Sequence, residues 1–89
     1  MTTRIPRNAK KVFYANETVT REDGTKFAGR EQRSTTFREA RKFLDDLGAP
    51  GNVTCWTAAS NQTSAYATRH ADGSWTALNW FTGTWEPID

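Results

Sequence analysis

One segment of the chain, TTFREARKFLDDLGAP, has the pattern of an amphipathic helix, and it is the only segment that has it. Thr36 and Glu39 stand at the spacing of a capping box, which closes the first turn of a helix. Gly48 stands where a left-handed C-cap would fall, and the proline two residues later blocks continuation. The sequence therefore predicts a helix over 37–47.

Apolar residues recur in this helix at three- and four-residue spacing and form one stripe. The stripe consists of Phe37, Ala40, Phe43, Leu44 and Leu47. One stripe on one helix can cover only one face of a sheet. We therefore expect the helix to pack on one face and the other face to have no helix over it.

The rest of the chain reads as strands separated by turn signals. Before the helix, KKVFYANETVT and FAGREQR flank an Asp-Gly turn and predict a hairpin. After the helix, the strand-like segments are NVTCWTAAS, TSAYATRH, SWTALNWF and a short TWEPI. We predict an α+β fold of ββαβββ order, with an antiparallel sheet that runs as a meander after the helix. A flexible basic tail over 1–8 precedes a single domain over 9–89.

The Asp72-Gly73 turn predicts which side chains share a face of the sheet. A two-residue primed turn there would pair His70 with Trp75. Counting residue pairs outward from this turn, and in the same way from a turn at Asn61-Gln62, divides the strand residues into two sets, one for each face of the sheet. The set expected under the helix is Trp56, Ala58, Ala65, Ala67, Leu78 and Trp80, and the set expected on the opposite face includes Cys55, Thr57, Tyr66, His70, Trp75, Asn79 and Phe81. Two alternatives remain for the second face: the N-terminal hairpin folds over it, or the sheet curls into a small barrel.

Arg69 is the residue that fits this register least well. The count places it on the side of the helix, where its stem would have to extend to the sheet edge to bring the charge into water.

The charges are unevenly distributed along the chain. Residues 1–42 hold eleven of the twelve Lys and Arg residues and five acids, whereas residues 43–89 hold one cation and five acids. In the helix, Arg38, Arg41 and Lys42 precede two aspartates, which is the unfavourable order for the helix dipole. Two interpretations remain open: chance placement on a solvated face, or a basic surface that meets an acidic partner.

Residues that could carry catalysis or bind a metal are few. One cysteine, Cys55, and one histidine, His70, cannot build a zinc site. Asp72 and Ser74 lie with His70 in one tight turn, where they cannot align as a catalytic triad. We therefore expect a protein that is not an enzyme and that uses no metal and no cofactor.

The chain lacks an apolar stretch long enough to cross a bilayer, and its first residues lack the apolar run of a signal peptide. A single cysteine suits a reducing compartment. We therefore expect a cytoplasmic protein with no membrane contact.

These observations favour a small binding protein that regulates or inhibits a macromolecular partner, as accessory and inhibitor proteins of phages and mobile elements do. The expected partner is a host or cognate protein, or a nucleoprotein complex, and a homodimer is compatible with the sequence. The residues expected to bind it are Tyr66, His70, Trp75, Asn79, Phe81, Arg38, Arg41 and Lys42, since aromatic and arginine side chains dominate interfaces.

The alternative is a nucleic-acid-binding protein in which aromatic rings stack on bases and arginines meet phosphates. The stacking residues would be Tyr66, Trp75 and Phe81, and the phosphate contacts would come from Arg30, Arg33, Arg38 and Arg41. A steep loss of binding with salt distinguishes this alternative from a protein interface. Sugar binding on an aromatic platform is a third option that suits a secreted protein better.

Overall fold

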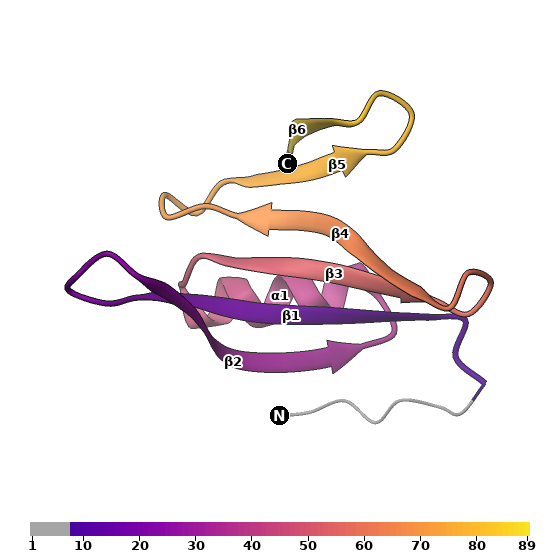
Figure 1. Ribbon diagram of the computed structural model, residues 1–89, viewed down its shortest axis with the longest axis horizontal. Helices are drawn as coiled ribbons and strands as arrows, with labels where there is room; N and C mark the ends of the chain where they lie inside the picture. Colours follow the sequence, from indigo (N-terminus) through magenta and orange to yellow (C-terminus); the bar gives the residue numbers. More distant parts are fainter. Residues whose placement is uncertain (1–7) are drawn as a thin grey trace.

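The computed structural model describes residues 8–89, and the predicted N-terminal tail, apart from its last residue, lies outside them. Six strands and one helix follow one another along the chain (Figure 1). They are β1 (Lys11–Thr20), β2 (Lys26–Ser34), α1 (Phe37–Leu47), β3 (Gly51–Thr57), β4 (Gln62–Arg69), β5 (Trp75–Asn79) and β6 (Thr84–Ile88). The strands form one antiparallel sheet in the order β2-β1-β3-β4-β5-β6. The predicted α+β fold is confirmed.

The ends of α1 are those that the capping residues predict. The side chain of Thr36 accepts a hydrogen bond from the backbone N–H of Glu39 at 3.3 Å. Gly48 has a left-handed conformation with a φ of 64°, and its N–H reaches the carbonyl oxygens of Leu44 and Asp45. Both caps satisfy backbone groups that the end of a helix leaves without partners.

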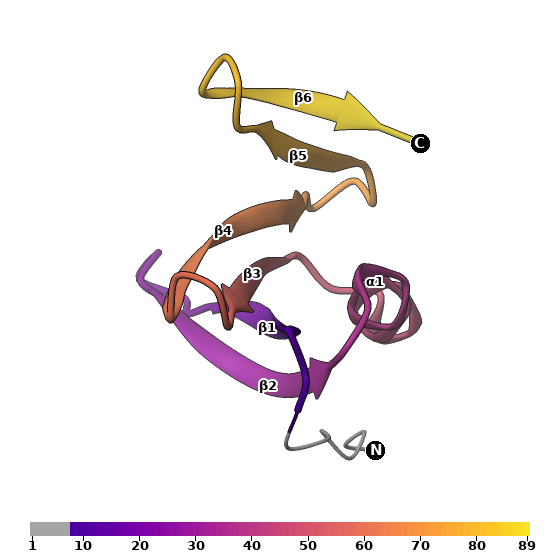
Figure 2. The ribbon, with the colours of Figure 1, turned by 90° about the vertical axis from the view of Figure 1, so that its right-hand side faces the viewer.

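The helix connects β2 to β3, two strands that lie on either side of β1 and run parallel to each other. It crosses one face of the sheet and contacts β1, β2 and β3. Figure 2 shows α1 beside this half of the molecule, while β5 and β6 extend away from it. The helix therefore covers only part of one face.

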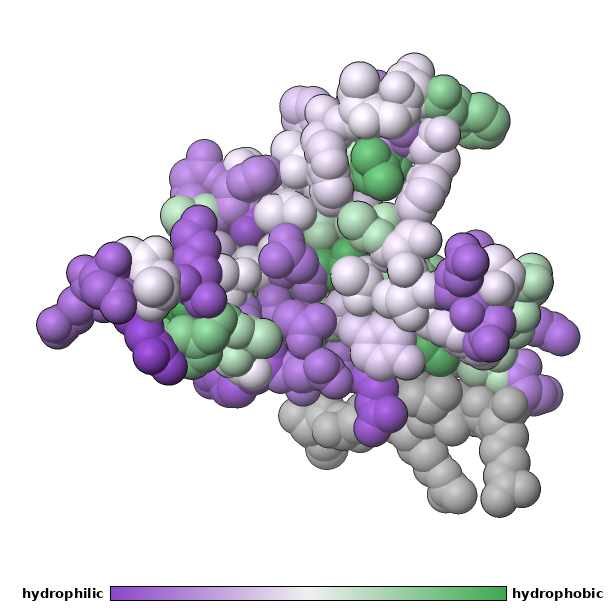
Figure 3. Space-filling model, viewed as in Figure 1, coloured by the Kyte–Doolittle hydropathy of each residue, from purple (hydrophilic) through white to green (hydrophobic). Residues whose placement is uncertain are grey.

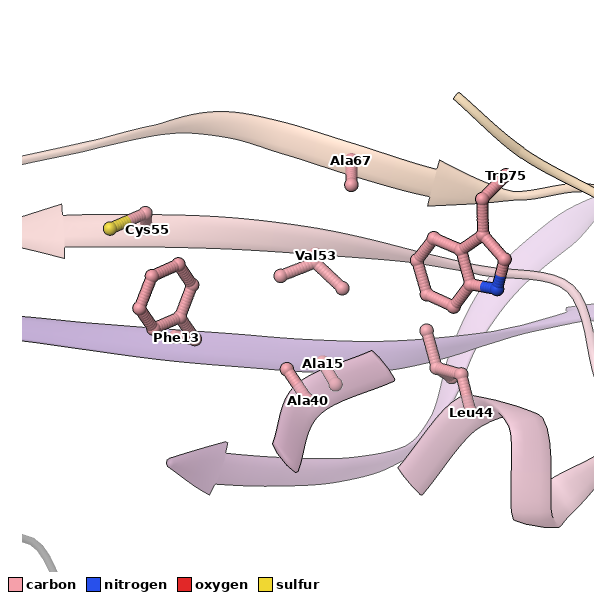
Figure 4. Close-up of a cluster of buried hydrophobic side chains, with 8 residues drawn as sticks. All are labelled: Phe13, Ala15, Ala40, Leu44, Val53, Cys55, Ala67 and Trp75. Carbon is pink, nitrogen blue, oxygen red and sulfur yellow. The ribbon is translucent and has the colours of Figure 1, made fainter. Parts of the chain in front are cut away.

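The core lies between α1 and the sheet (Figure 4). Its buried apolar residues are Phe13, Ala15, Ala40, Leu44, Val53, Cys55, Ala67 and Trp75. Aromatic rings close one end of it: the ring of Tyr66 lies 5.0 Å from those of Phe13 and Phe37, between ring centroids. The ring of Phe37 also meets Trp75 edge-on at 5.8 Å, a favourable aromatic geometry.

The predicted assignment of the two sheet faces is wrong for the largest side chains. Trp75 is 2% exposed in the core, and Tyr66 lies on the same, helix-covered side. Trp80, expected in the core, is 60% exposed. Trp56 pairs across the sheet with Val12, on the face that has no helix over it.

The length of the β4–β5 loop is one cause of this error. His70 donates its N–H to the carbonyl of Ser74, so the loop has three residues instead of two. Trp75 then stands opposite Arg69. A shift of one residue exchanges the two faces of a strand. Trp75 consequently points toward the helix, and Arg69, correctly placed on that side, points there with it.

A β-bulge in β4 is the other cause. Val53 pairs with Ala67 and Thr54 with Ala65, so Tyr66 is the extra residue of β4. Such a bulge bends the strand and changes the alternation of its side chains. Tyr66 and Ala67 thus both reach the core side.

Two of the alanines expected under the helix are exposed instead, while Ala67 is buried as predicted. Ala58 lies in the β3–β4 loop, because Thr57 pairs with Gln62, and Ala65 lies in the strand just before the bulge.

The N-terminal hairpin does not fold over the helix-free face. Strand β1 pairs with β3 and β2 pairs with β1, so the hairpin extends the sheet sideways. Within residues 8–89 the sheet ends at β2 on one side and at β6 on the other, and it does not close into a barrel. Both alternatives for covering that face are therefore wrong.

Candidate functional site

The turn between β5 and β6 holds two aromatic side chains in water. Trp80 is 60% exposed and Phe81 is fully exposed. We call these two residues the aromatic tip. Scattered single apolar residues are common on protein surfaces, but two adjacent large rings at the end of a hairpin are a concentrated apolar surface.

Hydrogen bonds fix the backbone that carries the aromatic tip. The side-chain oxygen of Asn79 accepts the backbone N–H of Phe81 at 2.9 Å and that of Thr82 at 3.3 Å. The N–H of Gly83 reaches the carbonyl of Asn79 at 2.7 Å, and Gly83 has a φ of 73° that favours glycine. The side-chain amide of Asn79 also donates to the carboxylate of Glu86 at 3.2 Å. Asn79, predicted to bind a partner, here holds the turn in place.

A cavity of about 360 Å³ lies beside the aromatic tip, on the side of the sheet that carries α1. Its lining residues are Lys11, Cys55, Thr57, Gln62, Ser64, Tyr66 and Trp80. Figure 3, which views the opposite face, shows a notch at the molecule's edge between the β5–β6 hairpin and the remainder of the molecule. The cavity brings together strands β1, β3 and β4 with the tip, and it includes Tyr66 from the predicted set of binding residues.

Cys55 forms part of the cavity wall and is 8% exposed. Burial raises the pKa of its thiol, and the ammonium group of Lys11 opposes this shift. A raised pKa leaves less thiolate at neutral pH, and the thiolate is the nucleophilic form. The environment of Cys55 is thus that of a buried structural thiol.

A second hollow, of about 310 Å³, includes His70 and lies on the face that has no helix over it. The Nε2 atom of His70 is 2.9 Å from the hydroxyl oxygen of Thr76. Nearby, the hydroxyl of Thr68 donates to the side-chain oxygen of Asn52 at 3.1 Å. These polar side chains hydrogen-bond one another across the sheet. His70 lines a different hollow from Tyr66 and Trp80, on the opposite face of the sheet.

The basic residues of α1 take different roles. The guanidinium of Arg41 lies over the ring of Trp75, 5.3 Å from the centroid, and 3.7 Å from the carboxylate of Asp45. Arg41 also donates to the backbone oxygen of Asp89. Lys42 pairs with the helix residue four positions later at 2.7 Å, and Arg38 is exposed. Arg41 therefore supports the fold, and Arg38 is the basic helix residue that remains open to a partner.

Asp45 is a structural residue that the sequence did not reveal as one. Its Oδ1 accepts a hydrogen bond from Nε1 of Trp75 and another from Nε of Arg69, both at 3.0 Å. These contacts explain an acid near the C-terminal end of the helix, where the dipole disfavours it. The inward placement of Arg69 was the sequence signal that could have revealed the need for an acidic partner on the helix.

Within residues 8–89, His, Cys, Asp and Glu side chains form no group of three or more that could hold a metal ion. No helix in this part of the chain is long and apolar enough to span a membrane. Comparisons with protein-family models, with curated proteins and with solved structures gave no match.

Proposed function

We propose that this chain is a small binding protein that attaches to a partner protein through the aromatic tip and thereby regulates or blocks that partner. The observation that carries the proposal is the full exposure of Phe81 on a turn whose backbone is fixed by Asn79. An exposed ring on a flexible turn would lose conformational freedom on binding. A ring on a fixed turn loses less, which favours affinity.

The chemistry of the aromatic tip suits a protein interface. Tryptophan is among the residues enriched in the energetically important centre of such interfaces, where the surrounding contacts exclude water. The side chain of Trp80 lines one wall of the cavity, and the cavity is large enough to accept a side chain of the partner. The proposal involves no catalysis. A thiol nucleophile needs a base beside it, and Cys55 and His70 lie in separate hollows.

Nucleic-acid binding has less support from the geometry. Of the arginines that the sequence offered for phosphate contacts, Arg30 pairs with Glu17 at 3.0 Å and Arg41 packs on Trp75. Trp75 itself is buried, so it offers no ring to a base. A host or cognate protein is therefore the favoured partner, and a nucleoprotein complex is compatible if its protein component makes the contact.

An affinity capture from a lysate of the native host tests this proposal. The wild-type chain and the Trp80→Ala/Phe81→Ala variant are immobilised in parallel, with and without nuclease treatment. We expect a defined protein to be retained by the wild type in both lysates and lost by the variant. Retention that depends on intact nucleic acid and falls steeply with salt would favour the alternative function instead.

A further inference from the structure

Strand β4 has a hydrogen-bonding partner strand along its whole length on one side but only along part of the other. All of β4 lies against β3, whereas only Ala67, Thr68 and Arg69 pair with β5. The stretch Gln62–Tyr66 has no strand on its β5 side within residues 8–89. Figure 1 shows β4 curving away from β5 along this stretch.

The bulge at Tyr66 explains the divergence of the two strands. A bulge bends its strand, and here it stands at the point where pairing between β4 and β5 stops. In an antiparallel sheet, alternate residues turn their N–H and C=O groups to opposite sides of the strand. Every second residue of Gln62–Tyr66 therefore directs its backbone N–H and C=O groups away from β3, toward the space between β4 and the β5–β6 hairpin. An unpaired edge of this kind is a template for another extended chain.

The cavity beside the aromatic tip lies along this same stretch of β4. Gln62, Ser64 and Tyr66 supply one wall, and Trp80 stands across from them. Aromatic rings on two sides suit an apolar side chain. The site thus joins a backbone edge, which any extended chain can use, to a pocket that selects one side chain.

Lys11 is the charged residue among the side chains that line this cavity, and its lining includes no carboxylate. Its ammonium group is close enough to lower the pKa of the Cys55 thiol against the effect of burial. An acidic side chain on the occupant would meet this charge. Complementary charge of this kind selects among partners and speeds association.

We propose that β4 accepts an extended, acidic segment of a partner protein as an added strand between Gln62–Tyr66 and the aromatic tip. This proposal rests on the proposed function and specifies how the partner is held. Side chains of an extended segment alternate between faces, so residues two positions apart point the same way. The segment therefore carries a large apolar residue for the pocket and, two positions away, an Asp or Glu for Lys11.

A symmetric dimer in which two copies pair through β4 fits the site less well. Pairing of two β4 edges would present the same stretch, QTSAY, to the cavity of each copy. This stretch contains no acidic residue that could meet Lys11. Charge complementarity thus disfavours this symmetric pairing, and a different protein is the occupant that we propose.

Selection from a displayed library of random peptides on the immobilised full-length chain tests the proposal. We expect the enriched peptides to share an acidic residue two positions from a large apolar residue. A synthetic peptide of the selected sequence should slow hydrogen exchange of backbone amides in Gln62–Tyr66. Its affinity should fall about tenfold or more for Lys11→Glu, because a like charge then faces the acid, while Lys10→Glu serves as the matched control.

A second pair of variants guards against misfolding as the cause of lost binding. Trp80→Ala removes one wall of the cavity, whereas Trp85→Ala removes a ring of the same hairpin that stands opposite Leu78, on the helix-free face. We expect weaker peptide binding for Trp80→Ala and unchanged binding for Trp85→Ala.

Three outcomes would overturn the proposal: no enriched sequence, peptide binding without protection of Gln62–Tyr66, or protection of this stretch by concentration-dependent self-association, which would identify a second copy as the occupant. A partner whose capture depends on the aromatic tip but which leaves the β4 amides unprotected would refute the added strand and leave the proposed function standing. If the peptide binds along β4 but the Trp80→Ala/Phe81→Ala variant still captures the partner, the proposed function is refuted instead.

Discussion

The indole Nε1 of Trp75 donates a hydrogen bond to Oδ1 of Asp45, 3.0 Å away, and thereby ties β5 to α1. The same oxygen accepts from Arg69 of β4, and the guanidinium of Arg41 lies over the indole ring. A buried indole usually needs a partner for its N–H. The helix supplies that partner at a position where its own dipole disfavours an acid, so tertiary contacts decide the placement of Asp45.

Trp75 should contribute far more to stability than Trp80. We expect Trp75→Ala to lower the free energy of unfolding by about 3–5 kcal/mol, because it leaves a cavity in the core. Trp80→Ala should change it by less than about 1 kcal/mol, since that ring is mostly exposed. Urea denaturation of both variants measures the difference. Equal losses would mean that the two rings are not placed as described.

Asp45 and its neighbour Asp46 offer a matched comparison on the helix. Asp45→Ala removes the acceptor of Trp75 and Arg69, and we expect a loss of about 1–2 kcal/mol in the free energy of unfolding. Asp46→Ala removes only an exposed pair with Lys42, which is worth less than about 1 kcal/mol. A larger loss for Asp46→Ala than for Asp45→Ala would contradict the structural role of Asp45.

The sequence predicted the elements well, because local signals define them. Thr36 and Gly48 mark the helix ends through hydrogen bonds made within a few residues. The strands were separated correctly by their turn residues. Caps and turns are formed by residues close together in the sequence, so a single sequence is enough to predict them.

The faces of the sheet were not predicted correctly, because an Asp-Gly pair fits two kinds of turn. A two-residue primed turn needs positive φ at its first residue, and in type I′ at both, whereas here only the second residue, Gly73, has it, with a φ of 89°. The carboxylate of Asp72 instead accepts the N–H and hydroxyl of Ser74, which favours the three-residue loop. Asp23 and Thr25 make the same contacts in the β1–β2 loop. An Asp-Gly-Ser or Asp-Gly-Thr sequence was thus the missed signal.

The candidate site was predicted only in part, since it depends on long-range geometry. Phe81 was expected in a strand on the face opposite the helix, whereas it stands fully exposed in the turn after β5. Tyr66 lines the cavity from the side of the helix instead of from the opposite face. Trp80 was assigned to the core because the predicted strand ran through it, whereas β5 ends at Asn79 and Trp80 lies in the turn. The bulge at Tyr66, which separates β4 from β5, has no sequence signal that we can identify.

Gly51 should be intolerant of even a methyl group. A Cβ atom there would lie 2.4 Å from the backbone oxygen of Asn16 and 2.8 Å from a methyl group of Leu44. We expect Gly51→Ala to cost about 1–3 kcal/mol in unfolding free energy, because a backbone atom cannot move away easily. Gly24→Asn is the comparison: no atom lies within 4 Å of the added carbon, so its smaller cost comes from the positive φ alone, which Asn adopts more readily than most residues. Similar melting temperatures for both variants would contradict this packing.

Glu17 should make stability depend on pH in the acid range. Side-chain and backbone hydrogen bonds from Arg30 hold the pKa of the Glu17 carboxyl below its usual value. Its contribution is therefore complete above the unfolded pKa of about 4.3 and is lost as pH falls through the lower, folded pKa. We expect the difference in melting temperature between the wild type and Glu17→Gln to shrink as pH is lowered below about 4.3. Glu22→Gln, in the exposed β1–β2 loop, is the comparison, and a difference that stayed constant for Glu17→Gln would refute the ion pair.

The central claim is that a partner protein buries the aromatic tip. Its most direct test is the affinity of the captured partner for Phe81→Ala and for Trp85→Ala, each measured together with the free energy of unfolding. We expect Phe81→Ala to lose about 2 kcal/mol or more of binding free energy, about thirtyfold in affinity, with unchanged folding stability, because its ring is fully exposed in the free chain. Trp85→Ala should bind like the wild type. Wild-type affinity in Phe81→Ala, or equal losses in the two variants, would contradict the claim.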